Sequence, residues 1–570
     1  MIILIRNTIC SNVLIIEHLN EQSNIYSKDS EMSLNRTNNI KQLAEDELDV
    51  LILGGGINGA VAAASLAAKG VKVGLIDKGD FAGATSSNSS NLAWGGIKYL
   101  ESHEYSLVNK LCKSRNNLMR HYPSSVTEVR FLTTIQKGFR FPVWFVFMGT
   151  LAYWFFGRLF TMAPKYLTRN AIKKLEPSIK ITGAQAGFEY SDAFLKDNDS
   201  RFVFNFITAA AKKSAIVANY VESVNAVREN GQWVIQAKDN TNNQTFTIKA
   251  KTLINACGPL VDQVNKGTKQ KTSHHHLFSK GVHLTVDRIS NDHRVLAFFA
   301  SDGRLFFVLP MGTKTCIGTT DNQVESHQTA VTDEDRQFIL DNANALLELD
   351  KPLTKADIIA ERCGVRPLAI EAEEGVADWV ALSRKHAIDV NKADKHISIF
   401  GGKLTDCINV GEEIAEIVKS LSIAMPKSNS IWYGEPADSV KEKFMSAIAE
   451  FNIDKLTPKG AIEPLSSRFW RRYGEDAFNL LEAIKQNPEK ANLALEHTEF
   501  TWAEIDWVAE HEMIVNLDDL LRRRSKATLV IRKKDLDNAK GLEAVSERLF
   551  GENAQQKVAE FRSTKDFNRV

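Results

Sequence analysis

A glycine-rich turn between an apolar strand and a small-residue helix constrains this chain more than any other feature of its sequence. The strand is expected over residues 50–53, and the turn at 54–59 (GGGING) fits the spacing G-x-G-x-x-G. An alanine-rich helix is predicted over 60–69, and a second strand over 71–76 closes a βαβ unit. This context predicts a Rossmann-like fold, which binds the diphosphate of a dinucleotide.

Individual residues of this unit have separate roles in such a site. Gly54 permits the tight turn, Gly56 lets the main chain approach a diphosphate, and Gly59 lets the helix pack against the sheet. The start of the helix, which includes Asn58, offers free N–H groups and partial positive charge to the phosphates. Asp77, at the end of the second strand, suits the ribose hydroxyls of an adenosine and argues against NADP.

The composition is that of a soluble globular protein with several domains. The chain has 570 residues, 44% hydrophobic and 25% charged, and its net charge of +1 gives no reason to expect a nucleic-acid partner. The six cysteines form no Cys-x-x-Cys pair, so we expect a reducing cytoplasm and no disulfide framework or zinc knuckle. The histidine run at 274–276 is interpreted as a solvated loop, and no metal site is expected.

The character of the sequence changes several times along the chain. Residues 1–45 are rich in Asn, Ser, Ile and Glu and are expected to be a disordered extension, with Met32 as an alternative start. Strand-like segments dominate 216–256 and 281–320, and after residue 426 the sequence is charged and helical in period. A second glycine-rich strand–helix turn at 400–406 lies far from the first, which suits a cofactor that extends through two domains, as FAD does.

Two segments have open interpretations. The uncharged run at 141–156 (FPVWFVFMGTLAYWFF) is shorter than the about 20 residues that span a bilayer. It suits a buried or interface helix, or a helix that attaches to a bilayer surface, where nearby Lys137 and Arg140 would meet anionic headgroups. The arginines at 522–524 follow Asn516, a plausible N-cap, and are interpreted as a solvated helix face, although they could touch lipid or a partner.

Further segments join the first turn in one ordered pattern. They are ATSSNSSNLAWGGIKYLE at 84–101, GFEYSDAFLKDNDSR at 187–201, NACGP at 255–259, IGTTD at 317–321, GVRPL at 364–368, FGGKLTD at 400–406 and EHEMIVNLDDLLRRRS at 510–525. From about residue 48 to about residue 530, the chain resembles the FAD-dependent glycerol-3-phosphate dehydrogenase family of D-amino-acid-oxidase-like flavoproteins.

This resemblance implies an α/β fold in three parts. A Rossmann-like FAD-binding domain, approximately 46–130, 185–265 and 355–425, is interleaved with an α+β substrate-cap domain, approximately 131–184 and 266–354. An all-α C-terminal domain follows over 426–570. The implied reaction oxidises sn-glycerol 3-phosphate to dihydroxyacetone phosphate by hydride transfer to flavin N5, with a membrane quinone as acceptor. The implied location is cytoplasmic, peripheral on the cytoplasmic face of the inner membrane, and a homodimer is compatible with it.

The resemblance also assigns residues to the FAD site. Hydroxyls of the serine-rich loop would contact phosphate and flavin, glycines after it would let the main chain lie against the flat ring, and N–H groups of Gly401 and Gly402 would face the flavin edge. Beyond the first turn and Asp77, the expected FAD-binding residues are Thr85, Ser86, Ser87, Gly95, Gly96, Gly258, Gly401, Gly402, Lys403, Leu404 and Thr405.

Oxidation of a secondary alcohol needs a group that takes the hydroxyl proton and cations that hold the phosphate. By resemblance Arg366 lies beside the substrate hydroxyl, His283 is the candidate base, and Lys403 binds substrate or flavin oxygen. Lys98, Tyr99 and Arg384 are expected to bind substrate. Structural roles remain open for each of them: a salt bridge for Arg366, a core position for His283 and a surface position for Arg384.

Three positions depart from the family pattern, and they put the substrate in doubt. Asn91 stands where the family usually has lysine, Trp94 where it has histidine, and Lys98 where it has arginine. The last change loses the bidentate fork of a guanidinium. Two alternatives therefore stay open: a soluble FAD oxidase that uses dioxygen on another hydroxy acid, a polyol phosphate or an amine, and a non-catalytic flavin-binding redox sensor.

Overall fold

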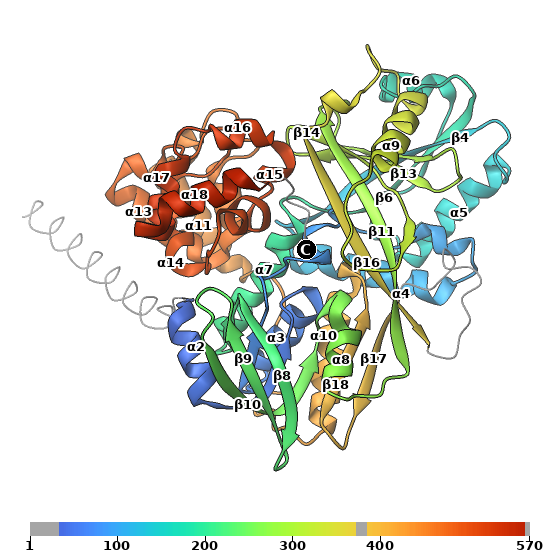
Figure 1. Ribbon diagram of the computed structural model, residues 1–570. Coiled ribbons are helices and arrows are strands. Elements are labelled where there is room, and N and C mark those ends of the chain that lie inside the picture. The colour runs from blue at the N-terminus through green and yellow to red at the C-terminus, as the bar shows by residue number, and fades with distance from the viewer. Residues whose placement is uncertain (1–33, 372–384, 565–570) are drawn as a thin grey trace, which may run out of the picture.

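The computed structural model describes residues 34–371 and 385–564, which are built on two large sheets and a group of helices (Figure 1). The first sheet has 8 strands. Its parallel centre is, in order, β18 (His396–Gly401), β10 (Thr245–Asn255), β1 (Glu47–Leu53), β2 (Val73–Ile76) and β7 (Ile216–Ala218). Antiparallel strands complete it: β17 (His386–Asn391), β8 (Val221–Glu229) and β9 (Gln232–Asp239).

The predicted βαβ unit is confirmed. Between β1 and β2 lies α3 (Ile57–Ala68), whose small side chains let it pack closely between α7 (Asp199–Ala211) and α10 (Cys407–Ser420). Because the central strands are parallel, their carboxyl ends meet at one edge of the sheet. The turn at 54–59, Asp77, the segment 256–259 and the second glycine turn therefore converge there.

The second sheet has 10 strands and stands above the first (Figure 1). Its order is β15 (Asn322–Val324), β11 (His274–Asp287), β14 (Lys314–Gly318), β13 (Leu305–Met311), β12 (Val295–Phe299), β4 (Val126–Gln136), β6 (Ala184–Leu195) and β3 (Leu92–Ala93). Two more strands pair onto this path, β16 (Ala360–Glu371) with β11 and β5 (Lys165–Leu167) with β6.

Two features of this sheet differ from expectation. We expected β6 and β16 in the FAD-binding part, but β6 pairs along β4 and β16 along β11, because strand partners are set by distant segments of the chain. His274–His276 are not a solvated loop. They begin β11, and His276 is buried.

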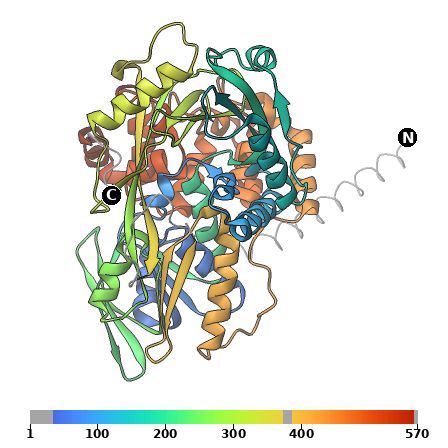
Figure 2. The same cartoon turned by 90° about the vertical axis from the view of Figure 1, so that its right-hand side faces the viewer.

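The C-terminal region is helical, as expected. Among the described residues after 437, no element is a β-strand. The helices are α11 (Asp438–Phe451), α12 (Leu465–Tyr473), α13 (Ala477–Gln486), α14 (Trp502–His511), α15 (Ala527–Val530), α16 (Lys533–Asp537), α17 (Leu542–Phe550) and α18 (Ala554–Ser563). They lie against both sheets on one side of the molecule (Figures 1 and 2).

The disordered extension predicted over residues 1–45 is wrong for the last part of that range. Residues 36–45 form a helix, α2 (Arg36–Glu45), rather than disordered chain. Its Leu43 is buried against the first sheet, and the Arg36 guanidinium forms an ion pair with Asp239. The helix is ordered because a tertiary contact and an ion pair compensate for a weakly apolar sequence. The predictions for residues 1–33 lie outside the described residues.

The apolar run forms α5 (Val143–Phe156) on the outer side of the second sheet (Figure 1). A buried helix is the wrong interpretation, because only Thr150 and Tyr153 are buried, whereas Trp144 is 67% exposed and Phe155 70%. The preceding helix is α4 (Tyr105–His121). Across the described ranges, no helix is long and apolar enough to cross a membrane.

Candidate active site

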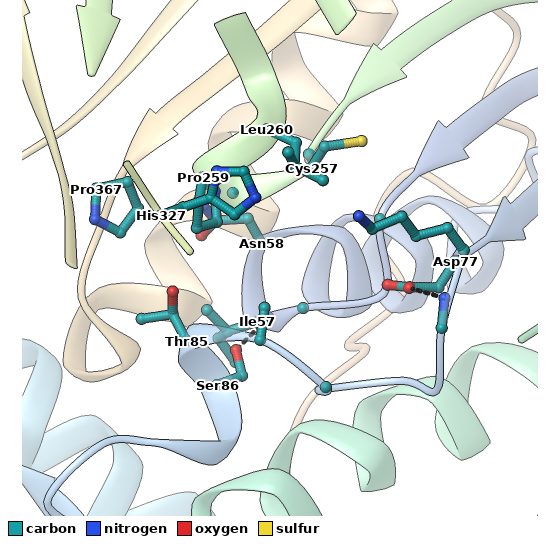
Figure 3. A pocket seen from close by; sticks show the side chains of 18 of the residues that line it. Ile57, Asn58, Asp77, Thr85, Ser86, Cys257, Pro259, Leu260, His327 and Pro367 are labelled. Carbon is teal, nitrogen blue, oxygen red and sulfur yellow. Dashed lines mark hydrogen bonds between the residues drawn. The ribbon is translucent and has the colours of Figure 1, made fainter. Parts of the chain in front are cut away.

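A cavity of about 1310 Å³ lies where the two sheets and the C-terminal helices meet. The carboxyl ends of the parallel strands line one side, β11 and β16 line another, and the C-terminal helices close one end. Figure 3 shows part of its wall, with Ser86 beside Ile57 and Asp77 beyond the glycine turn.

The first glycine turn lines the cavity with main chain. Gly54 has φ +98°, a conformation that favours glycine, and a Cβ at Gly59 would collide with the Gly54 carbonyl oxygen. At Gly56 the nearest atom to a Cβ would be Ser86 Oγ, at 3.5 Å, so glycine there leaves open space on the cavity side. The Ile57 N–H donates to Ser86 Oγ (3.1 Å) at the start of α3.

Asp77 closes the nucleotide end of the cavity from β2. Its carboxylate accepts hydrogen bonds from the N–H groups of Gly55 (2.7 Å) and Gly79 (2.9 Å). Burial raises the pKa of Asp77 to about 6, against the opposing effect of these two donors. The carboxylate is therefore fixed in orientation and ready to accept further hydrogen bonds from a ribose.

The serine-rich loop spans the space between the two sheets. Thr85 Oγ1 donates to the Val365 carbonyl (2.7 Å) on β16, and a Cβ at Gly364 would press against the Asn88 carbonyl oxygen at 2.8 Å. Thr85 and Ser86 line the cavity. Ser87 does not; its hydroxyl donates to the carbonyls of the loop itself and is buried. Its place indicates a structural role.

The arginine run of the C-terminal region holds this loop from behind, so its interpretation as a solvated helix face is wrong. The run lies in a π-helical turn, η10 (Asp519–Arg524), and Arg522 and Arg524 are buried. Arg524 forms a bidentate ion pair with Asp80 (2.8 and 3.0 Å), and Arg522 donates to Asn88 Oδ1 (2.7 Å). Although burial raises it, the neighbouring guanidiniums hold the pKa of Asp80 below its ordinary value.

The second glycine turn faces the first across the cavity. Gly401 (φ +59°) and Gly402 (φ +101°) end β18, and the Asn58 side-chain amide donates to the Gly401 carbonyl (3.0 Å). The Gly401 N–H donates to His276 Nε2 (3.1 Å), which corrects the expectation that both glycine N–H groups face the flavin. Gly258, Leu404 and Thr405 also line the cavity, whereas Gly95 and Gly96 do not.

Arg366 and His283 meet at the other end of the cavity, on one face of the second sheet. Ser279 pairs with Arg366 and His283 with Arg362, so the two side chains share a face because strand side chains alternate. A Cβ at Gly281 would collide with the Arg366 guanidinium, so glycine there makes room for it. The guanidinium donates to Asp321 Oδ1 (3.2 Å) and Thr319 Oγ1 (3.4 Å).

His283 is set up as a neutral imidazole. Within the described part of the chain neither ring nitrogen has a hydrogen-bond partner, although the residue is buried and lines the cavity. Burial, together with the positive charges of Arg362 and Arg366, holds the pKa of His283 well below its ordinary value. A buried polar group without a partner indicates a place where a ligand is expected.

Lys403 crosses this end of the cavity on an aromatic support. Its ammonium lies 4.1 Å from the Tyr99 ring centroid and 5.9 Å from that of Trp94, and all three side chains line the cavity. Lys98 does not line it. Arg384 lies outside the described residues, and its neighbour Lys385 lines the cavity.

The donor set fits FAD. The cavity has a helix start and a glycine turn for a diphosphate, a partly buried carboxylate for a ribose and a second glycine turn across from them. Residues 49–386 match the family model described as FAD dependent oxidoreductase, and 437–557 match the C-terminal domain of alpha-glycerophosphate oxidase. The first match covers more than half of the chain. The chain belongs to the FAD-dependent oxidoreductase family.

Several known proteins are similar to this chain. The aerobic glycerol-3-phosphate dehydrogenase of Staphylococcus aureus strain USA300 is 29% identical over 504 residues, which cover 85% of this chain and 88% of the relative. The glycerol-3-phosphate dehydrogenase from Bacillus halodurans, solved in complex with FAD, has a TM-score of 0.70 at 24% identity over 93% of this chain and 96% of the other. L-alpha-glycerophosphate oxidase from Mycoplasma pneumoniae has a TM-score of 0.51 at 18% identity, covering 66% and 95%.

Some wall residues of this flavoprotein were not predicted. The nucleotide end is lined by β8 residues and by C-terminal residues, among them Asn516, Asp518, Lys557 and Phe561. One signal for the C-terminal contribution was present, because the segment 510–525 is among those that carry the family resemblance. The β8 contribution had no comparable signal, since its residues carry no motif.

The three departures from the family pattern affect the cavity unequally. Of Asn91, Trp94 and Lys98, Trp94 lines the cavity and the other two do not. Asn91 is buried and accepts hydrogen bonds from the Arg362 guanidinium (3.1 and 3.2 Å), so it holds an arginine in place where a lysine would repel it. Trp94 is thus the departure that changes the shape of the wall.

Proposed function

We propose that this flavoprotein oxidises sn-glycerol 3-phosphate to dihydroxyacetone phosphate and passes the electrons to a membrane quinone. The observation that carries the proposal is that Arg366 and a neutral His283 lie on one wall of the FAD cavity, where neither ring nitrogen of His283 has a hydrogen-bond partner among the residues that the structure describes. The names of the similar proteins from Staphylococcus aureus and Bacillus halodurans support the substrate. Peripheral attachment to the cytoplasmic face of the inner membrane would bring the cavity to its acceptor.

Each group at the reaction end has a chemical task in this proposal. Bound FAD supplies the acceptor for the hydride that leaves the alcohol carbon. The pKa of His283 is held low, so its ring has an unprotonated nitrogen at pH 7. This nitrogen accepts the hydroxyl proton of the substrate. The Arg366 guanidinium stabilises the negative charge that develops on the oxygen, and its bonds to Thr319 and Asp321 fix its orientation.

The phosphate requires cations on the same side of the cavity. Lys403 and Lys385 line it, and the rings of Tyr99 and Trp94 restrict the position of the Lys403 ammonium. Arg384, adjacent to Lys385, is proposed as a third phosphate ligand on the resemblance. A compact dianion is favoured over an uncharged polyol because more than one cation faces it.

The direct test is anaerobic mixing of the purified protein with a panel of polyol phosphates while the flavin absorbance is recorded. Glycerol 3-phosphate is expected to bleach the flavin without any added acceptor, and glycerol and glycerol 2-phosphate to leave it yellow. Bleaching by another member of the panel alone would reassign the substrate. A flavin that no substrate bleaches would leave the redox-sensor alternative.

Dioxygen is the second candidate acceptor, because the C-terminal region matches the domain of an alpha-glycerophosphate oxidase. Turnover in air with release of hydrogen peroxide separates the two acceptors. A quinone-linked dehydrogenase is expected to produce little peroxide and to reduce a soluble quinone rapidly. Stoichiometric peroxide would replace quinone with dioxygen in the proposal.

We further propose that the apolar outer face of α5 and the loop after it contact the bilayer. This face exposes Trp144, Phe145, Met148, Phe155, Leu159, Phe160 and Met162. Exposed cations flank it at Lys137, Arg140, Arg158, Lys165 and Arg169, which suits an anionic surface.

Replacing Trp144 and Phe155 with serine should release the protein from phosphatidylglycerol vesicles in a sedimentation assay. Ile431→Ser, an exposed residue elsewhere (76%), should not.

A further inference from the structure

His276 is a buried histidine that the proposed reaction does not use. It lies on β11, and its side chain is fully buried against Phe400, with ring centroids 5.1 Å apart. Its Nε2 accepts a hydrogen bond from the Gly401 N–H (3.1 Å). The histidine therefore contacts the main chain of the cavity-lining turn directly.

Asp262 lies beside the other nitrogen of this ring. One carboxylate oxygen lies 3.3 Å from His276 Nδ1 and also accepts the His276 main-chain N–H (3.0 Å). Since Nε2 accepts from Gly401, the proton of a neutral ring resides on Nδ1, which faces Asp262. Asp262, on α8 (Val261–Gly267), thus anchors the His276 main chain and places a negative charge beside Nδ1.

The turn is held on both of its polar groups. His276 binds the N–H of Gly401, and the Asn58 side chain donates to its carbonyl (3.0 Å). Gly401 and Gly402 both have positive φ, so the turn has little local preference of its own and depends on such contacts. Asn58 belongs to the helix start at the diphosphate end, so these two bonds also link the two ends of the cofactor cavity.

We propose that His276, held by Asp262, is a positioning residue that fixes the Gly401–Gly402 turn against the flavin. The inference depends on FAD binding in the cavity and not on the identity of the substrate. If it is correct, the acceptor atom at the position of Nε2 is what matters, and the imidazole itself is replaceable. A glutamine amide reaches that position, whereas an asparagine amide reaches only the position of Nδ1.

The experiment compares His276→Gln with His276→Asn in the purified holoprotein. Release of FAD on dilution is followed by flavin fluorescence, together with the flavin absorbance spectrum and midpoint potential. Asn is expected to accelerate FAD release about tenfold, the effect of one lost hydrogen bond, and to shift the spectrum. Gln should stay within about threefold of the native protein. His275→Asn is the matched control, because His275 is exposed on the neighbouring position of the same strand.

Equal FAD release from the Gln and Asn variants would overturn the proposal, as would native behaviour of the Asn variant. If His276→Asn does not fold, Asp262→Ala takes its place. The Asp262 side chain is 39% exposed, so its truncation to alanine leaves no large cavity in the core. The same direction of change is then expected, and unchanged FAD release and spectrum would reject the role. Neither outcome depends on which alcohol the enzyme oxidises.

Discussion

The two ends of the cavity present different kinds of chemical groups. At the nucleotide end the βαβ unit presents mainly main-chain groups, because the turn at 54–59 and the start of α3 face the cavity and Asp77 is its principal charged side chain there. At the reaction end the second sheet and the second turn present Arg366, His283 and Lys403. The comparison teaches that the βαβ part of the nucleotide end is specified by local sequence, whereas the reaction end is specified by which distant strands become neighbours.

The largest effect is expected when a side chain is introduced into the glycine turn at the nucleotide end of the cavity. Gly56→Val should abolish FAD retention, because its methyl groups would occupy the space that glycine leaves for the diphosphate, while the nearest protein atom to the Cβ is as far as 3.5 Å. The purified variant should be folded by circular dichroism yet colourless. Gly149→Val, on exposed α5 with open space around it, is the control and should stay yellow. A yellow Gly56→Val protein would contradict the nucleotide assignment.

Arg366→Ala should have the opposite effect to Gly56→Val: FAD binding should persist, and the reaction with substrate should be slowed. Loss of the guanidinium removes stabilisation of the developing oxyanion, so anaerobic flavin reduction by substrate should slow about 10²–10³-fold while FAD stays bound. Stopped-flow absorbance measures the rate. Arg304→Ala serves as the control, because Arg304 immediately precedes β13 of the same sheet but lies outside the cavity wall. Unchanged reduction kinetics would remove Arg366 from the reaction.

The third prediction concerns the support behind the nucleotide end. Asp80→Ala leaves the Arg523 and Arg524 guanidiniums without their common carboxylate, and both Asp80 and Arg524 are fully buried. Loss of one partner of a buried ion pair should reduce the free energy of unfolding by about 3–5 kcal/mol and weaken FAD binding. Urea unfolding measures the first effect and FAD titration the second.

The matched control for Asp80→Ala is Glu543→Ala, which removes the exposed ion pair with Arg562. That change should cost less than about 1 kcal/mol, because exposed charges are screened by water. If both variants unfold at the same urea concentration as the native protein, the C-terminal arginines do not support the cofactor loop.

The same contrast explains how much the sequence predicts. The strand, turn, helix and second strand around Gly54–Gly59 depend on neighbours within a few residues, so their pattern predicted them. Arg522–Arg524 and His276 have unremarkable local contexts, and their partners Asp80, Asn88 and Gly401 are far away along the chain. Runs of charged residues or of histidines are usually solvated, so no local rule could place them in the interior.

The placement of β6 and β16 shows the same limit at the level of the sheet. Each has an apolar strand pattern that fits either sheet, and the choice depends on pairing with β4 and β11. For Arg366 and His283 the family resemblance was therefore needed, since their common face follows from the register of β11 against β16. Asn91 could not be understood from its own position, because its role is to hold Arg362.

The smallest expected effect is a pH dependence of FAD binding through Asp77. In the FAD-free protein its pKa is raised to about 6 by burial, and a ribose that donates hydrogen bonds requires the ionised carboxylate. Below pH 6 the binding of FAD must therefore displace a proton, so affinity should fall as the pH falls, by at most about tenfold per pH unit, and be constant above pH 7. FAD titrations between pH 5 and 8 measure the slope. Asp77→Asn should bind more weakly but without this slope, and an unchanged slope in that variant would assign the titration to another group.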